Sequence, residues 1–123
     1  MGTTDIERLI DIYCSAWSDP DPRRRREILT GIWGDAATYT DPSIHAATLD
    51  ELLDHITKVA AGRPGARVVR TSRVDMHHRL ARFGWRVVLA DGTERPEGLD
   101  LAEISSDGRI GRIIGFFGPL AYG

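Results

Sequence analysis

The sequence lacks the features that mark secreted and membrane proteins. Its single cysteine, Cys14, excludes an intramolecular disulfide. No run approaches the ~18 apolar residues of a membrane span. The first residues also lack the basic start and continuous apolar stretch of a signal peptide. We therefore expect a cytoplasmic protein, which fits a reducing compartment, with no membrane partner.

The chain also lacks a strong charge of one sign. Sixteen lysines and arginines are balanced by 18 acidic residues, for a formal net charge of −2. One basic run, Arg23 to Arg26, follows two aspartates and precedes a glutamate, and no aromatic or glycine pattern accompanies it. We interpret this run as the solvated start of a helix. No nucleic-acid partner is predicted.

Motifs that hold metals and cofactors are missing as well. The sequence contains no CxxC, no glycine-rich phosphate loop and no His-x-His or carboxylate cluster with ligand spacing. His77 and His78 are adjacent, so on a strand their side chains point to opposite faces. Only one of them can face inward, and the alternation does not decide which. We predict neither a metal nor a cofactor.

What is present is the composition of one globular domain, spanning residues 1–123. The apolar fraction of 41% and the charged fraction of 28% are ordinary for a folded chain. The first half has helical periodicity, with apolar stripes over about 4–18, 22–33 and 48–61. Asp21 followed by Pro22 is a typical helix start, as is Thr48 with Glu51. The second helix is predicted to include Trp33 and to end at Gly34.

The second half of the chain has the patterns of strands. A short strand is predicted over 36–40, and longer ones over 67–77, 80–90, 94–105 and 109–117. Turn signals at Asp91-Gly92 and Asp107-Gly108 join the last three into an antiparallel meander. Helices followed by a meander predict an α+β fold with the helices on one face of a curved sheet.

This order of elements resembles the nuclear transport factor 2-like fold, which includes ketosteroid isomerases and SnoaL-like polyketide cyclases. The segments that carry the resemblance are Ile-Trp-Gly-Asp-Ala-Ala-Thr-Tyr-Thr-Asp-Pro at 32–42, Glu-Gly-Leu-Asp at 97–100, Asp-Gly-Arg-Ile at 107–110 and Gly-Phe-Phe-Gly at 115–118. The resemblance implies a cone-shaped, curved antiparallel sheet wrapped around helices, with an internal apolar pocket. It also implies a homodimer formed through the sheet, for which Leu99, Leu101, Ile114 and Phe116 offer an apolar outer face.

The resemblance further implies three catalytic groups. In the ketosteroid isomerases these are a tyrosine on the first helix, an aspartate base before a proline, and a protonated aspartic acid on a late strand. Tyr13, Asp41 and Asp100 occupy the matching positions. Tyr13 could instead be a core residue, and Asp41 a turn residue that accepts a backbone N–H.

Alternation along the predicted strand at 94–105 makes Asp100 the most informative of the three. Gly98, Asp100, Ala102 and Ile104 share one face, which would place the acid among small and apolar neighbours. The alternative for Asp100 is an ion pair with an arginine such as Arg82 or Arg86. Apolar and polar residues predicted to line the pocket are Trp17, Trp33, Tyr39, His55, His78, Phe83, Trp85 and Phe117.

These residues together predict a small-molecule pocket protein whose partner is a small apolar molecule. Its expected chemistry is cofactor-free acid–base catalysis near a carbonyl, by isomerisation, cyclisation or dehydration. His55 flanks the stripe of the third helix, so it could either meet Asp41 at the mouth of the cavity or lie at the edge of the surface. One alternative is a non-catalytic binding module, particularly if the aromatic residues fill the cone. Another is epoxide hydrolase-like activity, which needs an Asp-Arg-Asp arrangement that the sequence does not place.

Overall fold

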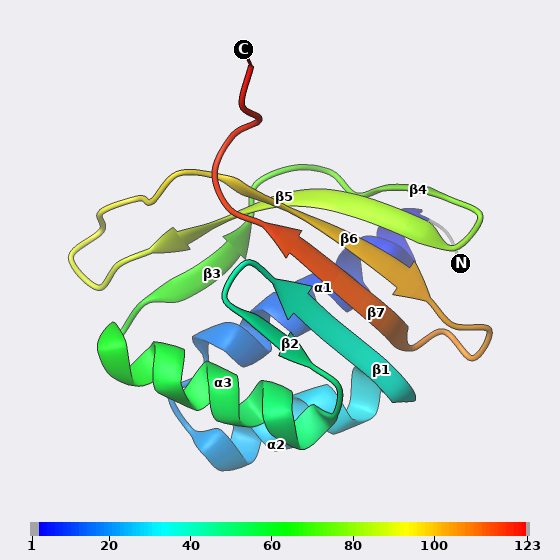
Figure 1. Cartoon of the computed structure of the whole chain (residues 1–123), viewed down its shortest axis with the longest axis horizontal. Helices are drawn as coiled ribbons and strands as arrows, with labels where there is room; N and C mark the ends of the chain where they lie inside the picture. The colour runs from blue at the N-terminus through cyan, green and yellow to red at the C-terminus, as the bar shows by residue number, and fades with distance from the viewer. Residues whose placement is uncertain (1–2, 123) are drawn as a thin grey trace.

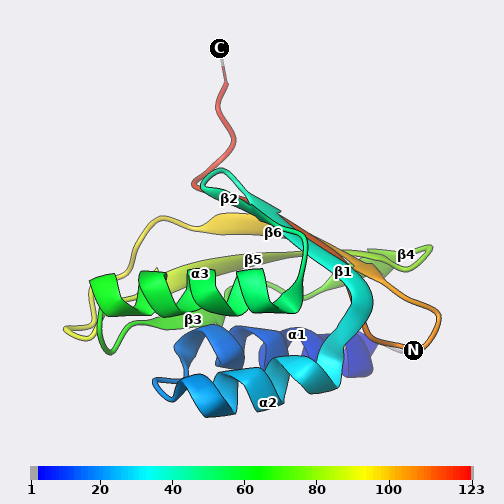
Figure 2. The same cartoon turned by 60° about the horizontal axis from the view of Figure 1, so that its bottom comes forward.

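The computed structural model describes residues 3–122 and places the helices on one side of a curved sheet (Figures 1 and 2). The helices in this part are α1 (Thr3–Ser18), α2 (Pro22–Ile32) and α3 (Leu49–Gly62). The strands are β1 (Trp33–Asp41), β2 (Ile44–Ala46), β3 (Arg67–Arg70), β4 (Asp75–His77), β5 (Leu80–Val88), β6 (Gly98–Ile104) and β7 (Ile110–Phe116). The α+β class predicted from the sequence is confirmed.

The starts of α2 and α3 follow the capping signals in the sequence. Asp21 accepts a hydrogen bond from the backbone N–H of Arg23 at 2.9 Å, with Pro22 at the first helical position. Thr48 accepts one from the N–H of Glu51 at 3.2 Å, and the Glu51 carboxylate reaches back to the N–H of Ala47 at 2.7 Å. Among residues 3–122, no helix is both long and apolar enough to cross a membrane.

The core lies between the helices and the inner face of the sheet. Its fully buried side chains include Ile6, Ile10, Leu29, Leu52, Ile56, Phe83, Ile110 and Ile113. They come from all three helices and from β5 and β7, at the positions that the apolar stripes and the strand alternation predict. The packing of these stripes therefore fixes which face of the sheet the helices cover.

The strand order is β2-β1-β7-β6-β5-β3, with β4 also paired to β5. Strands β5, β6 and β7 form the predicted antiparallel meander. Strand β1 pairs with β7 in parallel, so the sheet is mixed rather than wholly antiparallel. The sheet stays open, since β2 and β3 are its edges. This parallel pairing brings the end of β1, which carries Asp41, next to the last strand of the meander.

The predicted boundary between α2 and β1 is wrong, and the short strand β2 was not predicted. Trp33 is not the last turn of α2: it has extended backbone angles, caps the helix and begins β1, which is longer than the predicted 36–40 strand. Strand β2 was not predicted, because its three residues are too few to show alternation. It matters for the site, since the turn between β1 and β2 holds Ser43.

The predicted 67–77 strand is interrupted and forms β3 and β4. At the break, the N–H of Gly84 in β5 donates to the hydroxyl oxygen of Ser72 at 2.8 Å instead of to a backbone carbonyl. The hydroxyl of Thr71 meanwhile donates to Glu97 at 2.5 Å. The backbone N–H of Thr71 still donates to the carbonyl of Gly84 at 2.9 Å, so side chains replace the sheet ladder only after this residue. Serine and threonine favour this exchange, and alternation does not reveal it.

The basic run at the start of α2 is only partly solvated. Arg23, Arg24 and Arg26 are exposed, but Arg25 is 2% exposed. Its guanidinium donates to the carbonyl of Asp19 at 2.9 Å and to the hydroxyl of Thr57 at 3.1 Å. Arg25 therefore ties the α1–α2 connection to α3, which corrects the interpretation of this run as wholly solvated.

Strand β6 has the two faces predicted from its alternation. Gly98, Asp100, Ala102 and Ile104 are buried, whereas Leu101 is 40% exposed. On the neighbouring β7, Phe116 is 53% exposed. The outer face of the meander, made of Leu99, Leu101, Ile114 and Phe116, therefore presents apolar side chains away from the helices.

We expect this outer face to form a homodimer interface, because apolar sheet faces are rarely left in water. Light scattering or analytical ultracentrifugation at micromolar concentration should give the mass of a dimer. The double substitution Leu101→Lys and Phe116→Lys should shift it to monomer, while Leu120→Lys, at a position that is 72% exposed, should not. A monomeric mass for the unaltered chain would contradict the expectation.

Candidate active site

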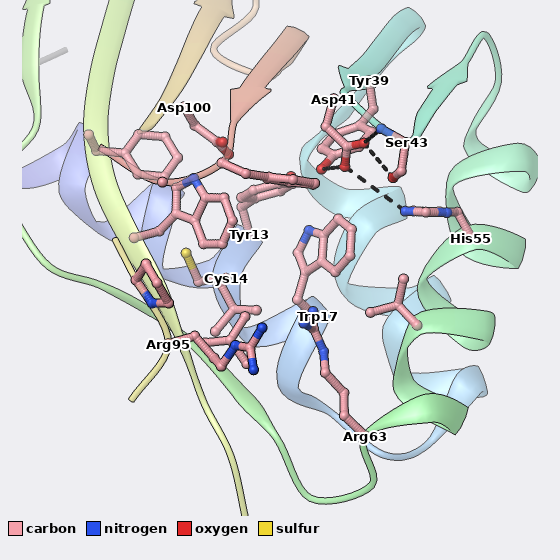
Figure 3. A pocket seen from close by; sticks show the side chains of 18 residues that line it. Tyr13, Cys14, Trp17, Tyr39, Asp41, Ser43, His55, Arg63, Arg95 and Asp100 are labelled. Atoms are coloured by element: carbon pink, nitrogen blue, oxygen red, sulfur yellow. Dashed lines mark hydrogen bonds and ion pairs between the residues drawn. The ribbon is translucent and has the colours of Figure 1, made fainter. Parts of the chain in front are cut away.

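A cavity of about 560 Å³ opens between α1, α3 and the inner face of the sheet (Figure 3). That volume lies within the roughly 300–1,000 Å³ typical of small-molecule pockets. Nine of the eleven predicted site residues line it: Tyr13, Trp17, Tyr39, Asp41, His55, Phe83, Trp85, Asp100 and Phe117. The aromatic side chains border the cavity and leave it open.

Asp100 lies on the inner face of β6, opposite Phe83 of β5, and is 5% exposed. Burial raises the pKa of its carboxyl to about 7, and the charge of Asp41 adds to the rise. The indole N–H of Trp85 opposes it, although its geometry falls short of a hydrogen bond. The alternative of an ion pair is wrong, because Arg82 pairs with Asp75 and Arg86 with Glu94.

Gly115 separates the two carboxyl groups of the site. It lies on β7, with Asp100 opposite it on β6 and the end of β1 on its other side. A Cβ atom at this position would come within 2.8 Å of Asp100 Oδ1 and 3.5 Å of the Cβ of Asp41. The missing side chain leaves room for the Asp100 carboxyl beside Asp41.

Asp41 ends β1 and is fixed by three hydrogen-bond donors. The Tyr39 hydroxyl donates to Oδ2 at 2.5 Å, and the backbone N–H and hydroxyl of Ser43 donate to Oδ1 at 2.7 and 2.6 Å. Asp41 is thus also the turn residue considered from the sequence. His55 Nε2, from α3, lies 4.0 Å from Oδ2 (Figure 3).

The ionisation of His55 and Tyr39 is set mainly by burial. Burial lowers the pKa of His55, and the nearby carboxylate of Asp41 only partly offsets this. Burial also raises the pKa of Tyr39, and its hydrogen bond to Asp41 raises it further. At neutral pH the site therefore contains a neutral imidazole and a neutral phenol around Asp41.

Tyr13 is 2% exposed on α1, and its ring stacks on Trp33 with centroids 6.3 Å apart. Burial raises the pKa of its hydroxyl well above the ordinary value, and the charges of Tyr39 and Asp100 act in the same direction. The indole N–H of Trp17 acts in the opposite direction, and because it is a donor it leaves the Tyr13 O–H without an acceptor. Tyr13 is therefore a neutral phenol on the cavity wall whose O–H is free to donate.

Two predicted lining residues lie elsewhere. Trp33 is buried behind Tyr13 as part of the core, because β1 begins at this residue and turns its ring away from the cavity. His78 lies in the β4–β5 turn with a positive φ of 50°, exposed and in contact with His77. Neither of the two adjacent histidines faces the cavity.

Sequence reasoning missed the cavity's arginines, Arg63 and Arg95, and placed Cys14 only as a packing residue. Arg63 continues the stripe of α3, four residues after Val59, and that spacing could have revealed it. Arg95 lies in the β5–β6 connection, where no periodicity applies. Within the described residues neither Asp41 nor Asp100 pairs with an arginine, so an Asp-Arg-Asp arrangement is not formed.

Solved structures with the same fold include natural and designed proteins. A candidate isomerase of the SnoaL-like family from Agrobacterium tumefaciens is 28% identical, with a TM-score of 0.88 over 94% of this chain and 99% of that one. A candidate SnoaL-like polyketide cyclase from Jannaschia is 13% identical, with a TM-score of 0.72 over 93% and 85%. A designed protein with the nuclear transport factor 2 fold is 17% identical, with a TM-score of 0.70 over 97% and 88%. No family model matches the sequence, and no curated protein matches it.

The chain has the nuclear transport factor 2-like fold. The solved structures that share this fold include SnoaL-like proteins, of which the Agrobacterium protein matches over nearly the full length of both chains. Because designed proteins share the fold, the fold alone does not carry an activity. The function has to be argued from the cavity and its side chains.

Proposed function

We propose that this protein is a cofactor-free acid–base enzyme that isomerises, cyclises or dehydrates a small, largely apolar carbonyl compound. The observation that supports this most directly is the pair of carboxyl groups on either side of Gly115. Both carboxyl groups line the same cavity, but their surroundings differ. Asp41 is surrounded by hydrogen-bond donors, whereas Asp100 has none within bonding geometry. Such differently placed carboxyl groups suit the roles of base and acid. Structural neighbours described as candidate isomerases and cyclases are consistent with it.

In this proposal Asp41 abstracts the proton next to the substrate carbonyl. Tyr39 and Ser43 hold its carboxylate in one orientation, which positions a base without a metal or cofactor. The neutral imidazole of His55, 4.0 Å away, can take the proton onward and return it at another carbon. Proton removal and return at different carbons is an isomerisation.

Asp100 and Tyr13 donate hydrogen bonds to the enolate oxygen that develops on the carbonyl. Both groups lie in a water-poor part of the cavity, where a hydrogen bond to developing charge is worth most. Since burial raises the pKa of Asp100 to about 7, the carboxyl is protonated below that pH and able to donate. The activity should therefore fall as the pH rises through about 7.

Substituting Asp41 tests the proposal. We expect Asp41→Asn to lower the rate at least 100-fold, because a positioned general base contributes about 10²–10⁴-fold. The assay follows exchange of α-hydrogens for deuterium by NMR, and conjugation by ultraviolet absorbance, with a panel of cyclic and β,γ-unsaturated ketones. The matched control is Asp35→Asn on the same strand, whose side chain is 95% exposed.

Two outcomes would contradict the proposal that this protein is an enzyme. One is a protein that binds the ketones but catalyses neither exchange nor conjugation, which is the behaviour of the non-catalytic binding module. The other is an Asp41→Asn variant as active as the Asp35→Asn control. Epoxide opening is not proposed, because neither carboxyl of the described site has the arginine that it needs.

A further inference from the structure

Two arginine side chains enter the cavity at the end away from Asp100 (Figure 3). Arg63 follows the last residue of α3, and Arg95 lies in the connection between β5 and β6. The two elements stand on opposite sides of the cavity, and their side chains point toward the space between them. Arg63 is half-buried, and Arg95 is exposed at the rim.

Neither guanidinium has a carboxylate partner within residues 3–122. By contrast, Arg70 pairs with Asp11 at 2.8 Å and Arg82 pairs with Asp75 at 2.9 Å. The side chains of Arg63 and Arg95 also make no hydrogen bond to another described residue. Their N–H donors are therefore free, and both side chains line the cavity, with Arg95 also exposed to solvent at its rim.

The surroundings of the pair are unfavourable to its charge. Burial lowers the pKa of Arg63, and the positive charge of Arg95 lowers it further. The lining nearby is apolar, with Trp17, Val59 and Val68. Two like charges at a partly desolvated site repel each other, and an anion bound between them would offset this repulsion. The cavity thus has a cationic end and, around Asp100 and Tyr13, a neutral end.

We propose that Arg63 and Arg95 bind an anionic group of the ligand, a carboxylate or another oxyanion, while its apolar body lies against the aromatic wall. The planar fork of a guanidinium matches the two oxygens of such a group. The proposal that an anion binds here depends only on the cavity. The proposal about the substrate rests on the proposed function: the substrate would be a carbonyl compound with an acidic group at the end remote from the reacting carbon.

A matched pair of fluorescent dyes tests the anion site. The probes are 8-anilino-1-naphthalenesulfonate and N-phenyl-1-naphthylamine, which share the same apolar rings and differ by one sulfonate. We expect the unaltered protein to bind the sulfonate dye about 10-fold more tightly than the neutral dye. This difference in affinity should shrink as salt is added, because salt screens the charges. Arg63→Gln and Arg95→Gln should each lower the affinity for the sulfonate dye by about 10-fold and change the affinity for the neutral dye by less than 2-fold.

The control variant is Arg112→Gln, because Arg112 borders the apolar groove on the outer sheet face, where a dye could also bind. It should leave both affinities unchanged. Circular dichroism and thermal unfolding should show each variant folded as the unaltered chain is. A second variant, Arg63→Lys, keeps the charge without the planar fork and should restore part of the affinity.

Three results would overturn the inference. They are failure of the sulfonate dye to bind, equal affinity for both dyes with no effect of the Arg63 and Arg95 substitutions, and loss of binding in Arg112→Gln alone. The titration involves no turnover, so it is independent of the Asp41→Asn assay. If dye binding depends on the arginines but no catalysis is found, the anion site is supported and the proposed enzymatic function is contradicted. If catalysis is found but dye binding does not depend on the arginines, the enzymatic function is supported and the anion site is contradicted.

Discussion

Asp100→Asn should make the protein more stable at pH 8, by roughly 4 kcal/mol at most. Burial raises the pKa of Asp100 from 3.8 to about 7 in the folded protein, and each pH unit of such a difference corresponds to about 1.4 kcal/mol. Between about pH 4 and pH 7 the unfolded chain has released the proton and the folded chain still holds it. Stability from this group is therefore complete below pH 4 and is lost as the pH rises to about 7. Asparagine fills the same space and never ionises.

The measurement is the free energy of unfolding by denaturant at pH 5 and pH 8. The unaltered chain should lose stability between these values more steeply than Asp100→Asn does. Glu103→Gln, on the same strand with a side chain 52% exposed, serves as the control and should behave like the unaltered chain. If Asp100→Asn is the less stable protein at pH 8, Asp100 is paired in solution and cannot donate to a ligand oxygen.

Phe83→Ala should destabilise the protein by about 3–5 kcal/mol, the usual cost of removing a fully buried phenylalanine ring. The Phe83 side chain is 2% exposed and stands on β5 between the core and the cavity, opposite Asp100. The denaturant midpoint measures the loss. Leu120→Ala, at a position 72% exposed, should change stability by less than about 0.5 kcal/mol. A Phe83→Ala midpoint equal to that of Leu120→Ala would mean that the ring is not packed.

The sequence predicted those parts of the fold that local chemistry decides. The starts of α2 and α3 were readable because Asp21 and Thr48 carry the side chains that satisfy free helix N–H groups. The two faces of β6 followed from alternation alone. Trp33 was placed wrongly because an apolar residue after a helical stripe fits both a helix end and a strand start. The break after β3 depends on Ser72, whose partner lies on another strand.

The site was predicted less directly than the fold. Tyr13, Asp41 and Asp100 were found through family resemblance, since nothing in their spacing shows that they share a cavity. The contact between Asp41 and His55 follows from the position of α3 against β1, which no local pattern contains. Arg95 could not be predicted at all, because a residue in a connection has no periodicity to place it. The prediction that His78 lines the cavity was wrong because this residue has a positive φ and lies in a turn rather than in a strand.

The parallel pairing of β1 with β7 sets the order in which the domain can be completed. Strand β1 pairs with β2 and β7, and β7 follows the other described strands of the sheet in the sequence. While the chain emerges from a ribosome, the β1–β2 hairpin has no sheet to join until residues 110–116 are free. The wall that carries Asp41 and Ser43 is thus added to the sheet only after β7 has been made. A nascent chain that stops before β7 can form its helices, but the carboxyl groups of Asp41 and Asp100 are not yet brought together.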